Sequence, residues 1–301
     1  MKILYCNDDL VPRTVDSCYE EESRAASECG LIFELLDFSA VRSRLADASV
    51  RFTKAAEVSE TAMYRGWMVT PSEYSTLYDA LANRNIQLIN SPEEYRHCHW
   101  LPESYSVIEG HTPRSVWIPA PASSWDMNAV TETLMQFGSS PVIVKDYVKS
   151  RKHEWTEACF IPDASDNLRS TQVVRRFIEL QDDDLQGGLV FREFVEFEPI
   201  GTHPKSGMPL TLEYRLFVLE GTVIAEAPYW EGQAHKERPP IAQFESLLKQ
   251  VKSRFFTCDV AKTKDGRWLI VELGDAQVAG LPERCDRKAF YEALAKRIDG
   301  Q

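Results

Sequence analysis

The sequence predicts a mixed fold in which an α/β unit is followed by an α+β unit. Apolar runs alternate with helical segments in the first third of the chain, which is typical of a parallel α/β sheet. Later runs are joined by turn signals such as Lys264-Asp265-Gly266, which favour antiparallel hairpins. Prolines gather between the two patterns, at Pro113, Pro119 and Pro121, so we place a domain boundary near residue 112.

The elements of the first unit follow from apolar spacing and from breaker residues. Residues 1–6 form an apolar run that enters a polar turn, and a helix over 14–29 ends at Gly30. A helix over 72–83 has Ser and Glu near its start and repeats apolar residues at helical spacing. Three more strands are predicted, at residues 31–38, 64–69 and 87–90.

The second unit reads as strands, hairpins and one long amphipathic segment. Residues 241–256 repeat apolar positions at helical spacing and predict a helix. Residues 212–219 and 223–227 flank Glu220-Gly221, which predicts a hairpin. A linker is predicted around the prolines that precede this unit. Further strands are predicted at residues 141–145, 188–195, 258–262 and 267–272.

Composition limits the classes of protein that fit. A length of 301 residues with 44% hydrophobic residues suits two globular domains. A net charge of -12 argues against general nucleic-acid binding, because phosphate backbones need clustered Lys and Arg. Seven cysteines without a CxxC pattern indicate reduced thiols and a cytoplasmic location. The sequence contains no apolar run of ~18 residues, so no membrane span is predicted. The first residues lack the apolar core of a signal peptide.

Two lysines mark the first candidate site. Lys145 ends an apolar strand, and Lys152 follows seven residues later. A lysine at the mouth of a buried strand is costly unless an anion meets it, and phosphate oxygens are such an anion. A solvated lysine at a strand end is the alternative, and the spacing alone does not separate the two interpretations.

The second candidate is the charged stretch over residues 191–199. Arg192, Glu193, Glu196 and Glu198 interrupt an otherwise apolar run. In one interpretation, strict alternation gives this strand one solvated face. In the other, the strand is a hinge whose backbone pairs with adenine while a carboxylate accepts the ribose hydroxyls.

Arginine and carboxylates on three later strands complete the candidate residues. Arg215 lies in a run that otherwise favours burial, so either Glu213, on the same strand face, or a phosphate neutralises it. Asp259 and Glu272 lie on two strands joined by a tight turn, which places them close together. Neighbouring carboxylates repel unless a cation lies between them, and Mg²⁺ prefers such oxygens. The alternative interpretation is that both residues are ordinary carboxylates on the protein surface.

The order of these motifs resembles the ATP-grasp fold over roughly residues 140–280. It is most similar to the RimK-like, divergent clade that includes the eukaryotic cell-division-cycle protein which assembles translation initiation factor 2. The clade's usual Asn at the third metal position is Gly274 here, and Asp275 beside it is expected to substitute. The matched residues are the paired lysines Lys145 and Lys152, the hinge residues Arg192, Glu196 and Pro199, the strand residues Glu213 and Arg215, and Asp259 and Glu272.

The resemblance implies an ATP site between two α+β lobes, with two Mg²⁺ ions and ligation of a carboxylate to an amine through an acyl phosphate. It implies a pre-ATP-grasp domain over residues 1–112 and an ATP-grasp domain over 113–301, with a lid at about 125–187 and a core at 188–301. The roles implied are phosphate binding by Lys145, Lys152, Arg192 and Arg215, the last three also in catalysis, adenine binding around Glu193, Phe194 and Val195, ribose binding by Glu196, and Mg²⁺ binding by Asp259, Glu272 and Asp275.

Two other functions stay open from the sequence. The same resemblance implies an ATP-dependent assembly chaperone for a partner protein, and Trp117 and Trp230 are candidate exposed aromatic contacts for it. A kinase-like phosphotransferase is the third. The carboxylate and amine substrates are unidentified, and a peptide or protein is one candidate. We expect their contacts in residues 230–240 and around Arg65.

Overall fold

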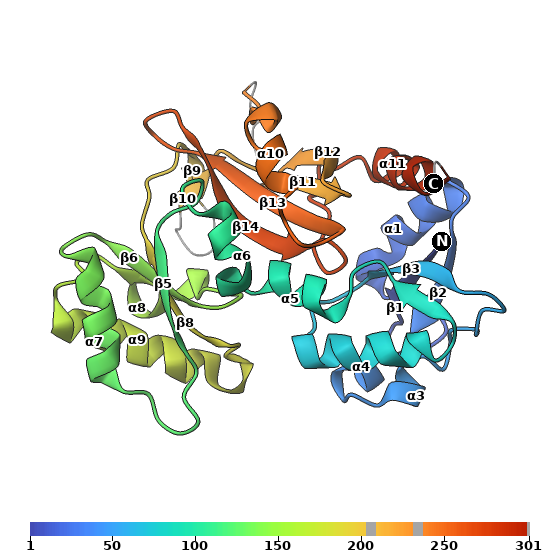
Figure 1. The fold of residues 1–301 in the computed structure, drawn as a ribbon, viewed down its shortest axis with the longest axis horizontal. Helices are drawn as coiled ribbons and strands as arrows, with labels where there is room; N and C mark the ends of the chain where they lie inside the picture. The colour runs from blue at the N-terminus through green and yellow to red at the C-terminus, as the bar shows by residue number, and fades with distance from the viewer. Residues whose placement is uncertain (203–208, 231–236, 300–301) are drawn as a thin grey trace.

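A computed structural model describes residues 1–202, 209–230 and 237–299. The chain forms an N-terminal α/β unit, at the right of Figure 1, a lid at the left and an antiparallel core sheet between and above them. The mixed α/β and α+β fold is therefore as predicted. Among the described residues, no helix is long and apolar enough to span a membrane.

The N-terminal unit is built on a parallel sheet with the strand order β2 (Ile32–Leu36), β1 (Lys2–Cys6), β3 (Glu60–Arg65) and β4 (Ile86–Leu88). A capping box starts α4 (Pro71–Ala82): the Thr70 hydroxyl accepts from the Glu73 N–H, and the Glu73 carboxylate accepts from the Thr70 N–H. The other helices here are α1 (Glu20–Glu28), α2 (Phe38–Arg42) and α3 (Ala46–Ser49), with a 3₁₀ turn at Ser17–Tyr19.

Two helices that the sequence analysis did not predict, as it did not predict several later ones, lead into the lid: α5 (Pro92–His99) and α6 (Leu101–Ile108). The lid sheet has the order β5 (Ser115–Pro119), β8 (Gly188–Glu193), β6 (Val142–Asp146) and β7 (Phe160–Ile161), and its pairs are antiparallel. The helices of the lid are α7 (Met127–Leu134), α8 (Trp155–Ala158) and α9 (Asn167–Gln181), and 3₁₀ turns lie at Met135–Phe137, Lys152–Glu154 and Asp182–Asp184.

The core sheet is antiparallel, in the order β12 (Thr222–Pro228), β11 (Glu213–Leu219), β13 (Phe255–Lys262) and β14 (Trp268–Asp275). A separate pair, β9 (Pro199–Thr202) and β10 (Pro209–Thr211), lies beside it. The last helix, α11 (Arg287–Asp299), returns to α1, so the C-terminus lies near the N-terminal unit in Figure 1.

Several predicted boundaries are wrong. Residues 241–256 are not one helix: a 3₁₀ turn, Ile241–Gln243, and α10 (Glu245–Leu248) precede a strand. Phe255 and Phe256 belong to β13, where they pair with β11, because their apolar side chains are buried on the sheet rather than on a helix face. The helix predicted from residue 14 begins at Glu20, the strand predicted at 64–69 ends at Arg65, and the predicted linker contains β5.

A buried ion pair ties the N-terminal unit to the end of the core sheet. Arg65 is fully buried, and its guanidinium donates to both carboxylate oxygens of Glu22, with distances of 2.8–3.0 Å. The same guanidinium donates to the carbonyls of Ala276 and Ala279, in the segment after β14. The Tyr291 hydroxyl, on α11, donates to Glu22 at 2.8 Å. One charge pair therefore joins α1, β3, α11 and the segment after β14.

We predict that Glu22→Ala destabilises the protein by ~3–5 kcal/mol, because it leaves the Arg65 guanidinium buried without its counter-ion. Urea denaturation of parent and variant measures this loss. Glu20→Ala, in the same helix, is the matched control: its ion pair with Arg24 is exposed and contributes little. Equal stability of the two variants would contradict the role given to Arg65.

Candidate active site

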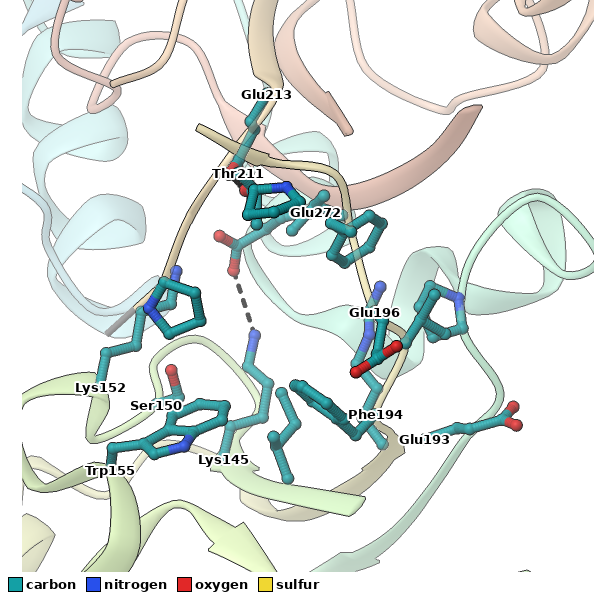
Figure 2. A pocket seen from close by; sticks show the side chains of 18 of the residues that line it. Lys145, Ser150, Lys152, Trp155, Glu193, Phe194, Glu196, Thr211, Glu213 and Glu272 are labelled. Atoms are coloured by element: carbon teal, nitrogen blue, oxygen red, sulfur yellow. Dashed lines mark hydrogen bonds and ion pairs between the residues drawn. The ribbon is translucent and has the colours of Figure 1, made fainter. Parts of the chain in front are cut away.

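A cavity of about 560 Å³ lies between the lid sheet and the core sheet, and Figure 2 shows side chains that line it. Val142 and Val144 of β6 belong to the buried cluster beneath the lid helices, so strand alternation turns Ile143 and Lys145 toward the cavity. Arg192 pairs with Ile143 across β6 and β8 and faces the same way. The pleat of the lid sheet thus supplies one wall.

Both predicted lysines line this cavity. Lys145 is buried, and its Nζ lies 3.1 Å from Oε1 of Glu272, the ion pair dashed in Figure 2. The Nζ of Lys152 lies 5.9 Å from the ring centroid of Trp230. Burial acts to lower the pKa of Lys152, but nearby carboxylates, that of Glu213 first, outweigh it and raise the pKa. Lys152 is therefore a charged group inside the cavity.

Between the two lysines runs a tight turn held by Asp146, a residue that the sequence patterns did not single out. Asp146 is buried, and its Oδ1 accepts from the N–H groups of Val148 and Lys149, both at 2.6 Å. Its Oδ2 accepts from the side-chain amide of Gln181 at 2.8 Å. An Asp that bonds the backbone two and three residues later fixes a turn. In the sequence, the only signal for this turn was an Asp that directly follows the strand lysine, Lys145.

The stretch predicted as a hinge, residues 191–199, consists of the end of β8 and the residues that follow it. The N–H of Phe194 donates to the Pro141 carbonyl at 2.9 Å, so that group is occupied. The N–H of Val195, in the cavity wall, has no acceptor within the described part of the chain. The Phe194 ring packs edge-on against Phe160, and Phe160 stacks on Trp155 with an interplanar angle of 9°. Phe194 and Trp155 thus give the cavity an aromatic wall.

The charged residues of the hinge stretch have different environments. Arg192 is buried, donates to the Thr112 hydroxyl at 2.7 Å, and has no carboxylate within ion-pair distance among the described residues. Burial lowers the pKa of Arg192 to about 10. Glu196 is exposed and pairs with Lys264 at 3.1 Å. Glu193 lines the rim, and its carboxylate points away from the ion pair dashed in Figure 2.

Asp259 and Glu272 lie near each other across the hairpin, as predicted, and a register shift between Asp259 and Val260 places them directly opposite each other in β13 and β14. Arg215 lies opposite Asp259 on the other side, in β11, and binds both of its carboxylate oxygens, at 2.8 and 2.7 Å. Residues paired directly across strands point to the same face. A row of Arg215, Asp259 and Glu272 therefore crosses three strands on one face of the core sheet.

The hypothesis that Glu213 neutralises Arg215 is wrong, because Asp259 does so. Glu213 lines the main cavity instead. Its Oε2 accepts from the Thr211 hydroxyl at 3.1 Å and from the Trp230 indole at 3.0 Å. Burial raises the pKa of Glu213 to about 7 against the attraction of Lys152. Glu213 is thus a cavity carboxylate whose position the sequence did not reveal.

Asp275 borders a second, smaller cavity together with Asp259 and Glu272, but among the described residues these carboxylates do not form a group that could hold a metal ion. Asp275 comes three residues after Glu272, so pleating directs the two side chains to opposite sides of β14. Its Oδ2 accepts from the Asn90 amide at 2.5 Å, and its Oδ1 accepts from the Gln277 N–H at 2.9 Å. Burial raises the pKa of Asp275 to about 7. Asp275 joins the core sheet to the N-terminal unit.

Asp259 and Glu272 remain as the candidate metal ligands. Mg²⁺ is usually bound through one or two carboxylates together with waters and substrate phosphates, so this pair suits it. In the part of the chain that the structure describes, no group of three or more His, Cys, Asp or Glu side chains could hold a metal ion. A cation at this pair would take at most two of its ligands from these carboxylates unless both bind bidentately.

A second cavity, of about 310 Å³, adjoins the first and shares Val148, Lys149 and Glu272 with it. Arg215, which we expected to contact nucleotide phosphates, lines this second cavity. Arg65, near which we expected substrate contacts, is fully buried.

Of the other region proposed for substrate contacts, Trp230 lines the main cavity, and residues 231–236 lie outside the described residues.

A cavity with lysines on one wall and Glu272 on the other, between a lid and an antiparallel core, is the arrangement expected of an ATP-grasp protein. A sequence model of the "ATP-grasp domain, R2K clade family 3" matches residues 136–294, more than half of the chain. The chain belongs to this family. No curated protein sequence matches it.

Solved structures show the same fold over the whole chain. D-cycloserine synthetase DcsG is 13% identical, with a TM-score of 0.62 over 99% of this chain and 100% of that one. A RimK domain ATP-grasp protein from Sphaerobacter thermophilus is 12% identical, with a TM-score of 0.60 over 98% of each chain. The ATP-grasp ligase PsnB, complexed with minimal precursor, Mg and ADP, is 12% identical, with a TM-score of 0.56 over 99% and 98%.

We predict that Asp275→Asn destabilises the fold and leaves the Mg²⁺ dependence of ATP binding unchanged. Both carboxylate oxygens accept hydrogen bonds, whereas an amide has one acceptor, so one buried N–H loses its partner at a cost of ~1–3 kcal/mol. Thermal unfolding and calorimetry measure the two effects. Asp79→Asn, at an exposed position of α4, is the control. A weakened Mg²⁺ dependence in Asp275→Asn would instead place this carboxylate at the metal.

Proposed function

We propose that this protein is an ATP-dependent carboxylate–amine ligase that acts through an acyl phosphate. The observation that carries the proposal is the meeting of Lys145 from the lid and Glu272 from the core inside one cavity of about 560 Å³. Cations for phosphate and carboxylates for Mg²⁺ are thus gathered from separate sheets at one place. The seven cysteines are free thiols, which fits the cytoplasmic location we also propose.

In this proposal the hinge side of the cavity binds the base and the sugar. Phe194 and Trp155 supply flat apolar surface for adenine, and the Val195 N–H is available as a donor to it. Glu196, at the rim, accepts the ribose hydroxyls in place of its exposed pair with Lys264. The Phe194 N–H, already bonded to Pro141, has no part in base recognition.

The phosphates lie toward Lys145, Lys152 and Arg192. An ammonium in a cavity is stabilised by phosphate oxygens, and Arg192 is a buried guanidinium without a carboxylate partner among the described residues. Asp259 and Glu272 would hold Mg²⁺, which would neutralise the phosphate oxygens between which charge develops. With the cation bound, Glu272 would release Lys145, and Lys145 would be free to contact phosphate.

The activated carboxylate needs no protein nucleophile in this scheme. A carboxylate oxygen of the substrate attacks the terminal phosphorus, ADP leaves, and an amine then displaces phosphate from the acyl carbon. The residues of this chain orient and neutralise the groups that react. Arg215 stays fixed by Asp259, and its charge lies toward the second cavity rather than toward the nucleotide.

The assembly-chaperone alternative loses the aromatic contacts that we considered for it. Trp117 lies in β5 and packs edge-on against Tyr105, with the ring centroids 5.4 Å apart. The Trp230 indole donates to Glu213 inside the cavity. Incubation with ATP, Mg²⁺ and a cell extract separates the two functions. A new product formed with loss of water supports the ligase, whereas a stable protein complex without such a product supports the chaperone.

We predict that Lys145→Ala and Lys152→Ala each weaken ATP binding by about tenfold or more, because each removes a charge-assisted contact with phosphate. Calorimetry with Mg²⁺-ATP measures the affinity. Lys252→Ala removes an exposed lysine far from the cavity lining and is the control. A lysine whose variant binds ATP like the parent is a solvated strand-end residue after all.

We predict that Glu272→Gln loses more turnover than ATP affinity. A neutral amide is a poorer Mg²⁺ ligand, and the metal matters most where charge develops in the transition state. Mg²⁺-ATP should also raise the melting temperature of the parent more than that of the variant. Glu283→Gln, at an exposed position, is the matched control. Identical Mg²⁺ dependence in the Glu272 variant and the parent would exclude Glu272 from the metal site.

A further inference from the structure

The second cavity meets the nucleotide cavity at one defined place. Val148, Lys149 and Glu272 line both cavities, so these residues mark their junction. Glu272 is also the carboxylate that we assign to Mg²⁺. A group that enters the second cavity as far as the junction therefore reaches the place where the terminal phosphate is held.

Buried residues from two units line the second cavity. His99 comes from α5 of the N-terminal segment, while Asp259 and Thr257 come from β13, and all three are at least 95% buried. The segment after β14 forms another side, and Arg65 holds it by donating to the carbonyls of Ala276 and Ala279. Hydrogen bonds therefore hold part of the cavity wall in place.

The volume of this cavity restricts its occupant. It measures about 310 Å³, against about 560 Å³ for the nucleotide cavity. Small-molecule sites begin at about 300 Å³, so this cavity is at the lower end of that range. It has room for a molecule the size of an amino acid.

The charges of the side chains at the junction indicate the charge of the group that binds there. Arg215 is paired with Asp259, and Glu272 with Lys145. Lys149 is exposed, lines both cavities, and has no ion-pair partner in the described ranges. An ammonium without a counter-ion at the junction attracts an anionic group.

The backbone of Lys149 is held in place by the turn at Asp146. Its N–H and that of Val148 donate to the buried Asp146 carboxylate, and the N–H of Asp146 donates to the Lys149 carbonyl at 2.9 Å. The backbone that carries this ammonium is therefore set by the turn, which limits the directions open to the side chain.

We propose that the second cavity binds the carboxylate substrate, an amino-acid-sized acid, and that Lys149 holds its carboxylate at the junction with the nucleotide cavity. This inference rests on the ligase function proposed above and gives it a substrate class. The carboxylate oxygen forms the bond to the terminal phosphorus of ATP, and ADP leaves with the electrons of the broken bond. Lys149 neutralises the carboxylate beside the negatively charged phosphates while it attacks.

Hydroxylamine trapping tests the proposal without knowledge of the natural amine. Hydroxylamine attacks the acyl carbon, phosphate leaves, and a hydroxamic acid forms that is measured by its colour with ferric iron. The full chain is incubated with ATP, Mg²⁺ and hydroxylamine. The probes are the free proteinogenic amino acids and short dicarboxylic acids, one at a time, with a tryptic peptide mixture and an unfolded protein as separate arms.

The expected result is a hydroxamate from at least one small acid. Lys149→Ala should raise the KM for that acid by about tenfold or more, because a charged contact is lost, and this rise should exceed any loss of ATP affinity. Lys149→Arg keeps the charge and should restore most of the activity. Lys288→Ala, an exposed lysine on α11, is the matched control and should behave like the parent.

Three outcomes would overturn the inference. Hydroxamate only from peptides or protein means that the ligase acts on larger acids, and the proposed function then survives. Normal kinetics for Lys149→Ala with a small acid remove Lys149 from the site. ATP binding by calorimetry with no hydroxamate from any probe counts against the small-acid site. Failure to bind ATP at all defeats the proposed function itself and is distinguished by that calorimetric measurement.

Discussion

The placement of two carboxylates side by side in a sheet is the constraint on which the site depends. Asp259 and Glu272 lie directly opposite each other across β13 and β14, where like charges destabilise a sheet. Each is neutralised from a different direction: Asp259 by Arg215 of the same sheet, and Glu272 by Lys145 of the lid sheet. The second pair joins the lid sheet to the core sheet, so electrostatic attraction contributes to the position of the lid against the core. A ligand that replaces Lys145 as the partner of Glu272 acts directly on that relation.

Two buried contacts fix the N-terminal unit against the core. Arg65 binds Glu22 and the carbonyls after β14, and Asn90 bonds both Asp275 and the backbone of Phe255. Arg65 is held by Glu22 within its own unit and reaches across to the carbonyls after β14, and Asn90 reaches across to Asp275 and Phe255. Since an unpaired buried charge or amide is costly, the interface has one favoured register. The N-terminal unit can therefore form a fixed wall of the second cavity.

The sequence predicted those features that depend on local spacing. The hairpin turn at residues 264–266 was enough to place Asp259 and Glu272 near each other, because pairing across a tight turn is a local property. Their direct pairing depends on a register shift between Asp259 and Val260, which the sequence did not reveal. The amphipathic segment at 241–256 was misassigned, since Phe255 and Phe256 obtain their burial from pairing with β11, which is distant in sequence. The partner of Arg215 was missed for the same reason: Asp259 is its neighbour across strands and not along one. Asp146 and Lys149 were missed because their importance lies in hydrogen bonds and cavities that form only when the lid folds.

The proposed metal site differs from the usual site of the clade at Gly274, where an Asn side chain is expected. A Cβ built on Gly274 would lie 2.9 Å from the Thr257 hydroxyl, so a side chain there would require Thr257 to move. The adjacent Asp275 is bonded to Asn90 and Gln277 and does not fill the gap. Side-chain oxygens for a cation therefore come from Asp259 and Glu272, and both already have basic partners. Because Mg²⁺ keeps close to octahedral coordination, most of its ligands here must be phosphate oxygens and waters. Metal binding then depends on the nucleotide, and the space beside Gly274 stays open as part of the second cavity.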